Sequence, residues 1–166
     1  MTNSPSYDEQ LAIEKYWAGV GGQAFMPGTN RASDRYARAS WLLAAIPRDV
    51  DKSIISAVPY QSFMWQAMAS VRSVIQAVSV PLGIKDPNNP NIASTHWRTV
   101  IDHGNRVLLF DAATSPNAFW VKMADLDLSE GAPVRRLPIS GRTYNGNTAP
   151  KFEPAKPFKF SGVKAP

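Results

Sequence analysis

The chain has 166 residues, 44% of them hydrophobic and 19% charged, a composition typical of one globular domain and unlike that of a disordered or fibrous protein. It has no apolar run long enough to span a bilayer, no recognisable secretion signal and no cysteine, which excludes disulfides, thiolate metal sites and a cysteine nucleophile within this sequence. The formal charge of +5 is spread along the chain and enriched in a Pro-rich end, so we expect neither a nucleic-acid nor a membrane partner.

The first eleven residues have the pattern of a strand end that leads through a turn into a helix. Thr2 and Asn3 are typical of a strand, Ser4-Pro5-Ser6 of a turn, and the residues from Asp8 onward of a helix. We therefore expect that strands which would normally precede this unit are missing from it.

Three helices are predicted in the first half of the chain. They run from Asp8 to Trp17, from a cap at Ser33 or Asp34 to Ile46, and from Phe63 to Val78. The third has the clearest stripe of apolar residues at helical spacing, with Gln66, Ser73 and Gln76 predicted to face away from it. In the second helix, Tyr36, Ala39, Leu43 and Ile46 form the apolar face, and the pattern of Arg31, Arg35 and Arg38 on another face is typical of a solvated surface.

The second half is predicted to be extended. Strands are expected over Thr95 to Asp102, Arg106 to Asp111 and Ala118 to Met123, and His103-Gly104-Asn105 forms a hairpin turn between the first two. Strands that follow the helices in this way favour an α+β fold in which helices cover an antiparallel sheet. We divide the chain into a domain over residues 1–140 and an extended Pro/Lys-rich tail over 141–166, which we expect to pack on the domain or on a neighbouring subunit.

Residue types associated with catalysis or metal binding are few. His96 and His103 flank one predicted strand and would point to opposite faces, so we expect no metal site, and no cofactor motif is present. Asp102-His103 has no serine nucleophile to serve. Removal of Met1 would expose Thr2 as an N-terminal nucleophile, but we interpret Thr2 as an ordinary strand residue.

Several ordered segments together resemble the choloylglycine hydrolase family of linear amide C–N hydrolases, which includes bile salt hydrolases and penicillin V acylases. Between Ile46 and Ala69 the fit is loose. The segments that carry the resemblance are Thr2–Leu11, Pro27–Ala39, Val78–Gly83, Ser94–Val100 and Asn117–Leu128.

This resemblance implies the C-terminal part of a four-layer αββα N-terminal nucleophile hydrolase, whose nucleophile is a cysteine at the mature N-terminus. That cysteine has no counterpart here. Asn3 matches the asparagine whose side-chain amide stabilises the oxyanion, and Arg35 matches the arginine near the nucleophile and substrate.

The implied function is that of an amidase portion which is inactive alone because its nucleophile is missing. The substrate classes that the resemblance implies are penicillin V, conjugated bile salts and N-acyl homoserine lactones. The alternative is a non-catalytic, split or truncated product that works only by assembling with an N-terminal partner or with itself, and we expect a homo-oligomer or such complementation. The resemblance is compatible with a periplasmic location, which no feature of this sequence indicates.

Overall fold

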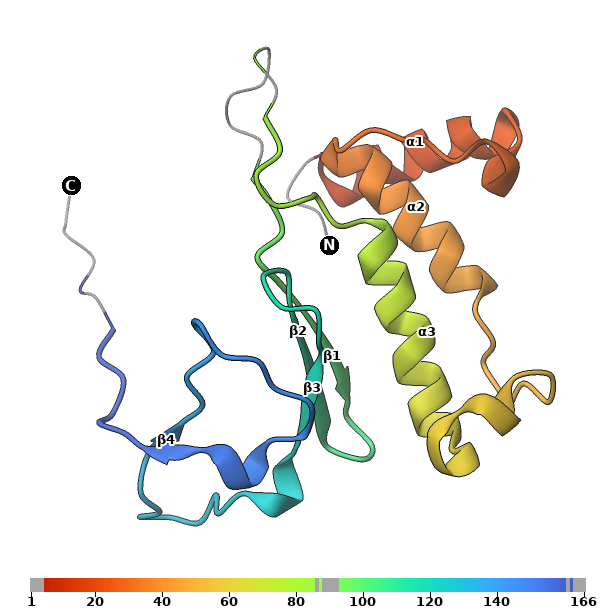
Figure 1. Cartoon of the computed structure of the whole chain (residues 1–166). Coiled ribbons are helices and arrows are strands. Elements are labelled where there is room, and N and C mark those ends of the chain that lie inside the picture. The colour runs from red at the N-terminus through yellow and green to blue at the C-terminus, as the bar shows by residue number, and fades with distance from the viewer. Residues whose placement is uncertain (1–4, 86, 88–92, 161, 163–166) are drawn as a thin grey trace.

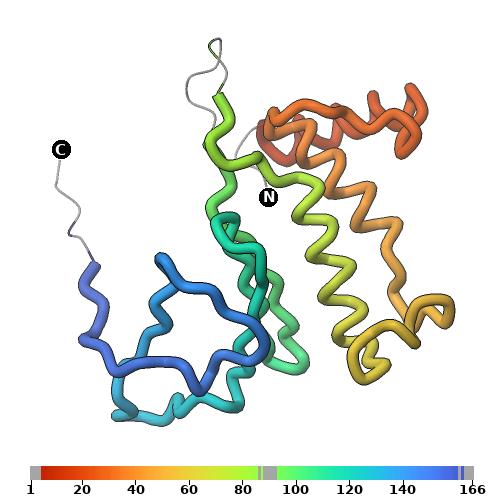
Figure 2. Tube along the Cα trace, in the orientation of Figure 1, coloured from red at the N-terminus to blue at the C-terminus, as the bar shows by residue number. Residues whose placement is uncertain are grey.

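Figure 1 shows the computed structural model of the chain, which describes residues 5–85, 87, 93–160 and 162. Three α-helices lie on one side of an antiparallel sheet, and the C-terminal segment (residues 123–160) lies on its other side (Figures 1 and 2). The helices are α1 (Tyr7–Gly19), α2 (Ala32–Ala45) and α3 (Phe63–Ala77). Short 3-10 helices occur at Gly22–Phe25, Ile55–Ala57, Pro59–Gln61, Met123–Asp125 and Ala149–Lys151.

The main sheet has four strands in the order β1-β2-β3-β5. β1 (Trp97–Asp102), β2 (Val107–Ala112) and β3 (Phe119–Lys122) pair antiparallel, and β5 (Gly146–Asn147) pairs parallel to β3. A separate two-stranded ladder joins β4 (Arg135–Arg136) to β6 (Glu153–Pro154). Successive side chains of a strand point to opposite faces, so the register assigns each side chain of the main sheet to the helical face or the outer face.

One hydrophobic core lies between α3 and the helical face. Met68 packs there with Val100 of β1 and with Val107 and Leu109 of β2. α3 forms at this place because its apolar residues recur at helical spacing, as the sequence predicts. Trp65 extends the core toward β3, where its ring lies 4.7 Å from that of Trp120.

A second core lies on the outer face and is covered by the C-terminal segment. Phe119 and Val121 of β3 pack there against Tyr144 and Ala149, which come from the chain after β4. The segment is held to β3 by hydrogen bonds from the backbone N–H and the hydroxyl of Thr148 to the carbonyl of Trp120, at 2.9 and 3.1 Å. This cover stops before β1.

The outer face of β1 is open in the part of the chain that the structure describes. Trp97 is 60% exposed and Ile101 is 53% exposed, although both are large apolar residues in a regular strand. β1 is also an edge strand, so one side of its backbone has no neighbouring strand within the described sheet. The sheet is thus closed on one face and partly uncovered on the other.

The expected fold class is confirmed: the chain is α+β, with helices covering an antiparallel sheet. The three helices and the three longer strands lie within three residues of their predicted limits. Two details of α2 were wrong. Its cap is Arg31 rather than Ser33 or Asp34, and its buried residue is Ala37, whereas Leu43 of the predicted apolar face is 44% exposed.

The prediction that Gln76 faces away from the apolar stripe was wrong, because its amide donates to Asp111 of β2 at 3.1 Å. Gln66 does point away from the sheet, but it is only 1% exposed. Its amide nitrogen donates to the carbonyl of Asp49 at 2.9 Å, and its amide oxygen accepts from the backbone N–H of Asp51 at 3.0 Å. The loop between α2 and α3 therefore folds back over the side of α3 that is turned away from the sheet. Helical periodicity identifies the face toward the sheet and carries no information about such a loop.

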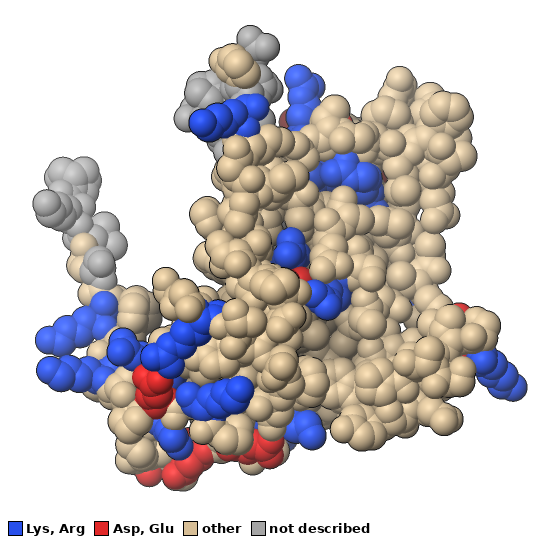
Figure 3. All heavy atoms as spheres, viewed as in Figure 1, with Lys and Arg blue, Asp and Glu red and all other residues tan. Residues whose placement is uncertain are grey.

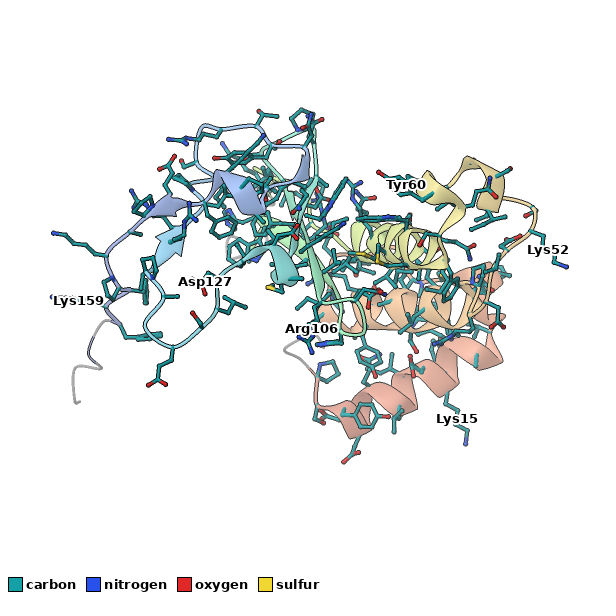
Figure 4. The ribbon with its side chains drawn as sticks, turned by 90° about the horizontal axis from the view of Figure 1, so that it is seen from below. Lys15, Lys52, Tyr60, Arg106, Asp127 and Lys159 are labelled. Carbon is teal, nitrogen blue, oxygen red and sulfur yellow. The ribbon has the colours of Figure 1, made fainter. Side chains whose placement is uncertain are left out.

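The α2–α3 loop and the C-terminal segment lie at opposite ends of the molecule. Figure 4 places Lys52 and Tyr60 of the α2–α3 loop at the opposite end of the molecule from Lys159. Positive side chains gather over the C-terminal segment in Figure 3, where Arg135, Arg136, Arg142, Lys151, Lys156 and Lys159 are exposed. Among the described residues, no helix is long and apolar enough to cross a membrane, and no three metal-ligating side chains come together.

Candidate active site

The first sequence motif leads into α1, whose first turn is closed by a capping interaction. Both the backbone N–H and the hydroxyl of Ser6 donate to the carboxylate of Glu9, at 2.9 and 2.7 Å. These bonds lower the pKa of Glu9, and its negative charge near the helix N-terminus is favourable. Asn3, the predicted oxyanion residue, and Thr2 precede this turn and lie outside the described residues.

The start of α1 is tied directly to the start of α2. Gln10 is 1% exposed, and its amide nitrogen donates to the carbonyl of Ser33 at 3.2 Å. Ser33 lies two residues before Arg35, in the first turn of α2. The contact therefore joins the segments 2–11 and 27–39 through two residues that are 23 apart in sequence.

The first turn of α2 is shaped by Pro27 to Asp34. The hydroxyl of Thr29 bonds the carboxylate of Asp34 and accepts from the backbone N–H of Arg31 at 3.2 Å. Arg38 donates through one nitrogen to the carbonyls of Pro27 and Thr29, at 2.6 and 2.8 Å. Burial lowers the pKa of Arg38, an effect that the nearby Asp34 carboxylate opposes. The Pro-Gly-Thr segment is thus a fixed loop before the helix.

Arg35 projects from this turn toward the end of α3. Its Nε donates to the carbonyl oxygen of Val78 at 2.8 Å, and Val78 is the residue that ends α3. A cation is favourable at this place because the last carbonyls of a helix carry partial negative charge. Within the part of the chain that the structure describes, Nε is the only side-chain nitrogen of Arg35 that makes a hydrogen bond. The two terminal nitrogens make none with the described residues.

The expectation of a solvated arginine stripe on α2 was therefore wrong for two of its three members. Arg35 and Arg38 are half-buried and bond backbone carbonyls, while Arg31 is exposed. The spacing of the three residues in sequence could not reveal this difference, because the carbonyls that Arg35 and Arg38 bond belong to residues outside α2.

Residues just before and within β1 are bonded to the residues that follow α3. Thr95 holds Val80 twice: its hydroxyl accepts from the backbone N–H of Val80 at 2.9 Å, and its own N–H donates to the carbonyl of Val80 at 2.9 Å. Arg98 of β1 donates through Nη1 to the hydroxyl of Ser79 at 3.2 Å. Residues 78–80 are therefore held from α2 on one side and from β1 on the other.

Behind this junction lies a buried carboxylate that the sequence analysis did not single out. Asp111 of β2 has a side chain that is only 3% exposed and accepts from Arg72 and Gln76 of α3 and from Arg98 of β1. Burial by itself would raise the pKa of Asp111, but the hydrogen bonds and positive charges of Arg98 and Arg72 outweigh it and hold the pKa below its ordinary value. The carboxylate therefore stays ionised near neutral pH.

The other polar residues considered from sequence take no part in this arrangement. Asp102 accepts from the backbone N–H and the side-chain amide of Asn105, at 2.9 and 2.8 Å, and these bonds lower its pKa. It therefore stabilises the β1–β2 turn. His96 and His103 are exposed and stand at opposite ends of β1.

Hydrogen bonds join the described parts of three of these segments (5–11, 27–39 and 78–83) at the starts of α1 and α2 and the end of α3. A scan against models of protein families finds no match. Two penicillin V acylases are similar to the chain, however. The acylase of Pectobacterium atrosepticum is 39% identical over 98% of this chain and 44% of its own length. The solved structure of the acylase from Agrobacterium tumefaciens is 46% identical and superposes with a TM-score of 0.82, over 98% of this chain and 49% of that one.

The chain thus spans about half the length of the relatives that it matches. Both the sequence identity and the TM-score extend over nearly all of its residues, so the likeness is not limited to the segments that carry the resemblance in sequence. Over nearly all of its length the chain is therefore similar to the C-terminal portion of penicillin V acylases, which belong to the choloylglycine hydrolase family that the sequence segments indicate.

Proposed function

We propose that this chain supplies the C-terminal part of an amidase that cleaves linear C–N amide bonds, and that the 166-residue polypeptide is inactive by itself. The observation that supports this most directly is the identity of 39–46% to penicillin V acylases over 98% of a chain that contains no cysteine. In the complete enzyme the substrate acyl group passes from the amide nitrogen to a cysteine sulfur, and water then releases it.

In this proposal Asn3 and Arg35 act on the reacting groups. The Asn3 side-chain amide donates to the oxygen that becomes negative in the tetrahedral intermediate, an interaction worth about 3–4 kcal/mol of barrier. Arg35, fixed through Nε to Val78, directs its terminal nitrogens to the thiolate or to the substrate. Penicillin V is the first substrate to test, followed by conjugated bile salts and N-acyl homoserine lactones.

The first experiment assays the purified chain with penicillin V, alone and after co-expression with the N-terminal portion of the Pectobacterium acylase. We expect no hydrolysis by the chain alone and measurable hydrolysis by the combined protein. In the combined protein, Asn3→Ala is expected to lower kcat about 10²- to 10³-fold. Hydrolysis by the isolated chain that Asn3→Ala abolishes would contradict the proposed inactivity.

The role of Arg35 is tested against a neighbour on the same helix. Arg35→Ala is expected to lower kcat/KM of the combined protein by at least about tenfold, because a fixed charge near the nucleophile is lost. Arg31→Ala is the matched control, since Arg31 carries the same charge four residues earlier but is exposed. Equal activities of the two variants would exclude the assignment of Arg35.

A second candidate function is assembly without catalysis, and the open outer face of β1 favours it. Trp97 and Ile101 are more than half exposed there, beside an outer-face core that is well covered. An N-terminal segment of the kind that the relatives contain, or a second copy of this chain, would cover these side chains. Analytical ultracentrifugation tests this function, because a monodisperse monomer with cooperative unfolding would count against it.

A further inference from the structure

The residues that fix the end of α3 form a chain of contacts that begins at a buried charge. Asp111 lies directly opposite Arg98 in the β1–β2 register, on the helical face. Arg98 donates to its two carboxylate oxygens through Nε at 3.1 Å and Nη2 at 3.4 Å. From α3, Arg72 and Gln76 donate to the same carboxylate at 3.0 and 3.1 Å, four residues apart and thus on one face of the helix. Asp111, itself on β2, therefore links α3 to β1.

The third nitrogen of Arg98 carries this connection to the end of α3. Nη1 donates to the hydroxyl of Ser79 at 3.2 Å, and that hydroxyl donates in turn to the carbonyl of Ile75 in the last turn of the helix. A guanidinium whose Nε and Nη2 are occupied by one carboxylate has little freedom to rotate, so its Nη1 is also fixed in direction. Ser79 is consequently held by a planar group and not by a flexible one.

Arg35 meets the neighbouring residue on the other side. Its Nε bonds the carbonyl of Val78, one residue before Ser79, and Val78 is itself buried. A shift of Ser79 would turn the peptide unit that follows Val78 and move this carbonyl. The direction of the Arg35 guanidinium thus depends on Asp111, which lies on β2 and makes no hydrogen bond to Arg35.

We propose that Asp111 is a positioning residue for Arg35, acting through Arg98 and Ser79 on the carbonyl of Val78. The importance of this for catalysis rests on the role of Arg35 in the proposed function. The connection itself does not, because it is a property of the folded chain. A purely structural role of Asp111 would lower stability without altering the bond between Arg35 and Val78.

The test measures hydrogen exchange of the Arg35 Nε–H in the full chain by ¹⁵N NMR. Arg98→Lys keeps a positive charge beside Asp111 but removes the fork that reaches Ser79, and Ser79→Ala removes the last acceptor. Each is expected to speed exchange roughly tenfold, the effect of losing one net hydrogen bond. Asp111→Asn is expected to do the same, and the other two variants decide the question if it does not fold.

Val121→Ala is the matched control, because it removes buried methyl groups from the outer-face core without touching the helical face. It is expected to lower stability while the exchange of the Arg35 Nε–H stays as in the wild type. Unchanged exchange in folded Arg98→Lys and Ser79→Ala would overturn the proposal, as would equal acceleration in Val121→Ala.

The catalytic consequence is measured separately in the combined protein described above. Arg98→Lys is expected to lower kcat about tenfold with a smaller change in KM, because the Arg35 guanidinium is then poorly directed in the transition state. An unchanged kcat would overturn the link to catalysis. If the combined protein never hydrolyses an amide, the proposed function fails, but the exchange experiment still decides whether Asp111 positions Arg35.

Discussion

The two faces of the sheet are covered in different ways. On the helical face a regular helix, α3, packs along β1 and β2, and a buried carboxylate with two arginines lies beside the apolar side chains. On the outer face an irregular segment with short strands and a 3-10 helix covers β3 and part of β2, and β1 is left open. Both faces are apolar. The described residues cover the helical face, whereas they leave the outer face of β1 exposed.

This difference separates a face that the described residues bury from a face that they leave partly open. The contacts that direct Arg35 lie on the helical face, which the described residues cover. In the proposed assembly, the open part of the outer face is where an N-terminal segment or another copy would add contacts. Three predictions test this comparison.

The largest expected effect comes from truncating the outer-face core. Phe119 is buried, its ring lies 5.4 Å from that of Phe110 and 5.5 Å from that of Tyr144, and Phe119→Ala should lower the free energy of unfolding by about 3–5 kcal/mol. Urea unfolding followed by circular dichroism measures it. The helical-face reference is Met68→Ala, expected to cost about 2–5 kcal/mol. A Phe119→Ala cost well below that of Met68→Ala would show that the C-terminal segment covers the outer face only loosely.

An intermediate effect is expected from acid, through Asp111. Its pKa in the folded chain is lowered, so its ionised form stabilises the fold above the unfolded pKa of about 3.9, and this contribution is lost as pH falls through the lower folded value. The difference in unfolding free energy between wild type and Asp111→Asn should be constant above about pH 5 and narrow below about pH 4. Urea titrations at several pH values measure it, and a difference that widens in acid would mean that the pKa is raised.

The smallest expected effect is at the open part of the outer face. Trp97→Ser and Ile101→Ser should each change the stability of the monomer by only about 0.5 kcal/mol, because both side chains are more than half exposed. They should nevertheless weaken any self-association seen by sedimentation. Thr99→Ser is the matched control, an exposed position on the same face of β1 that remains polar and similar in size. A large loss of monomer stability in Trp97→Ser or Ile101→Ser would mean that the outer face of β1 is covered.

The sequence predicted the elements well because local patterns specify them. The stripe from Met64 to Val78 specifies α3, and the β-branched and aromatic runs specify β1 to β3. The resemblance carried by the ordered motifs also identified the family and pointed to Arg35. Local pattern did not reveal the surroundings of Arg35, because Val78 is 43 residues away.

What the sequence by itself determined is therefore the order and type of the elements and the family that they resemble. The tertiary structure decided which charges are buried and what they hold. Asp111 looked like an ordinary strand residue, and it became the centre of a buried cluster only because the β1–β2 register and the packing of α3 brought Arg98, Arg72 and Gln76 to it from 13 to 39 residues away. Periodicity reports which face of an element is apolar, whereas a buried charge is stable only where distant donors converge on it, and that convergence depends on the packing of the whole chain.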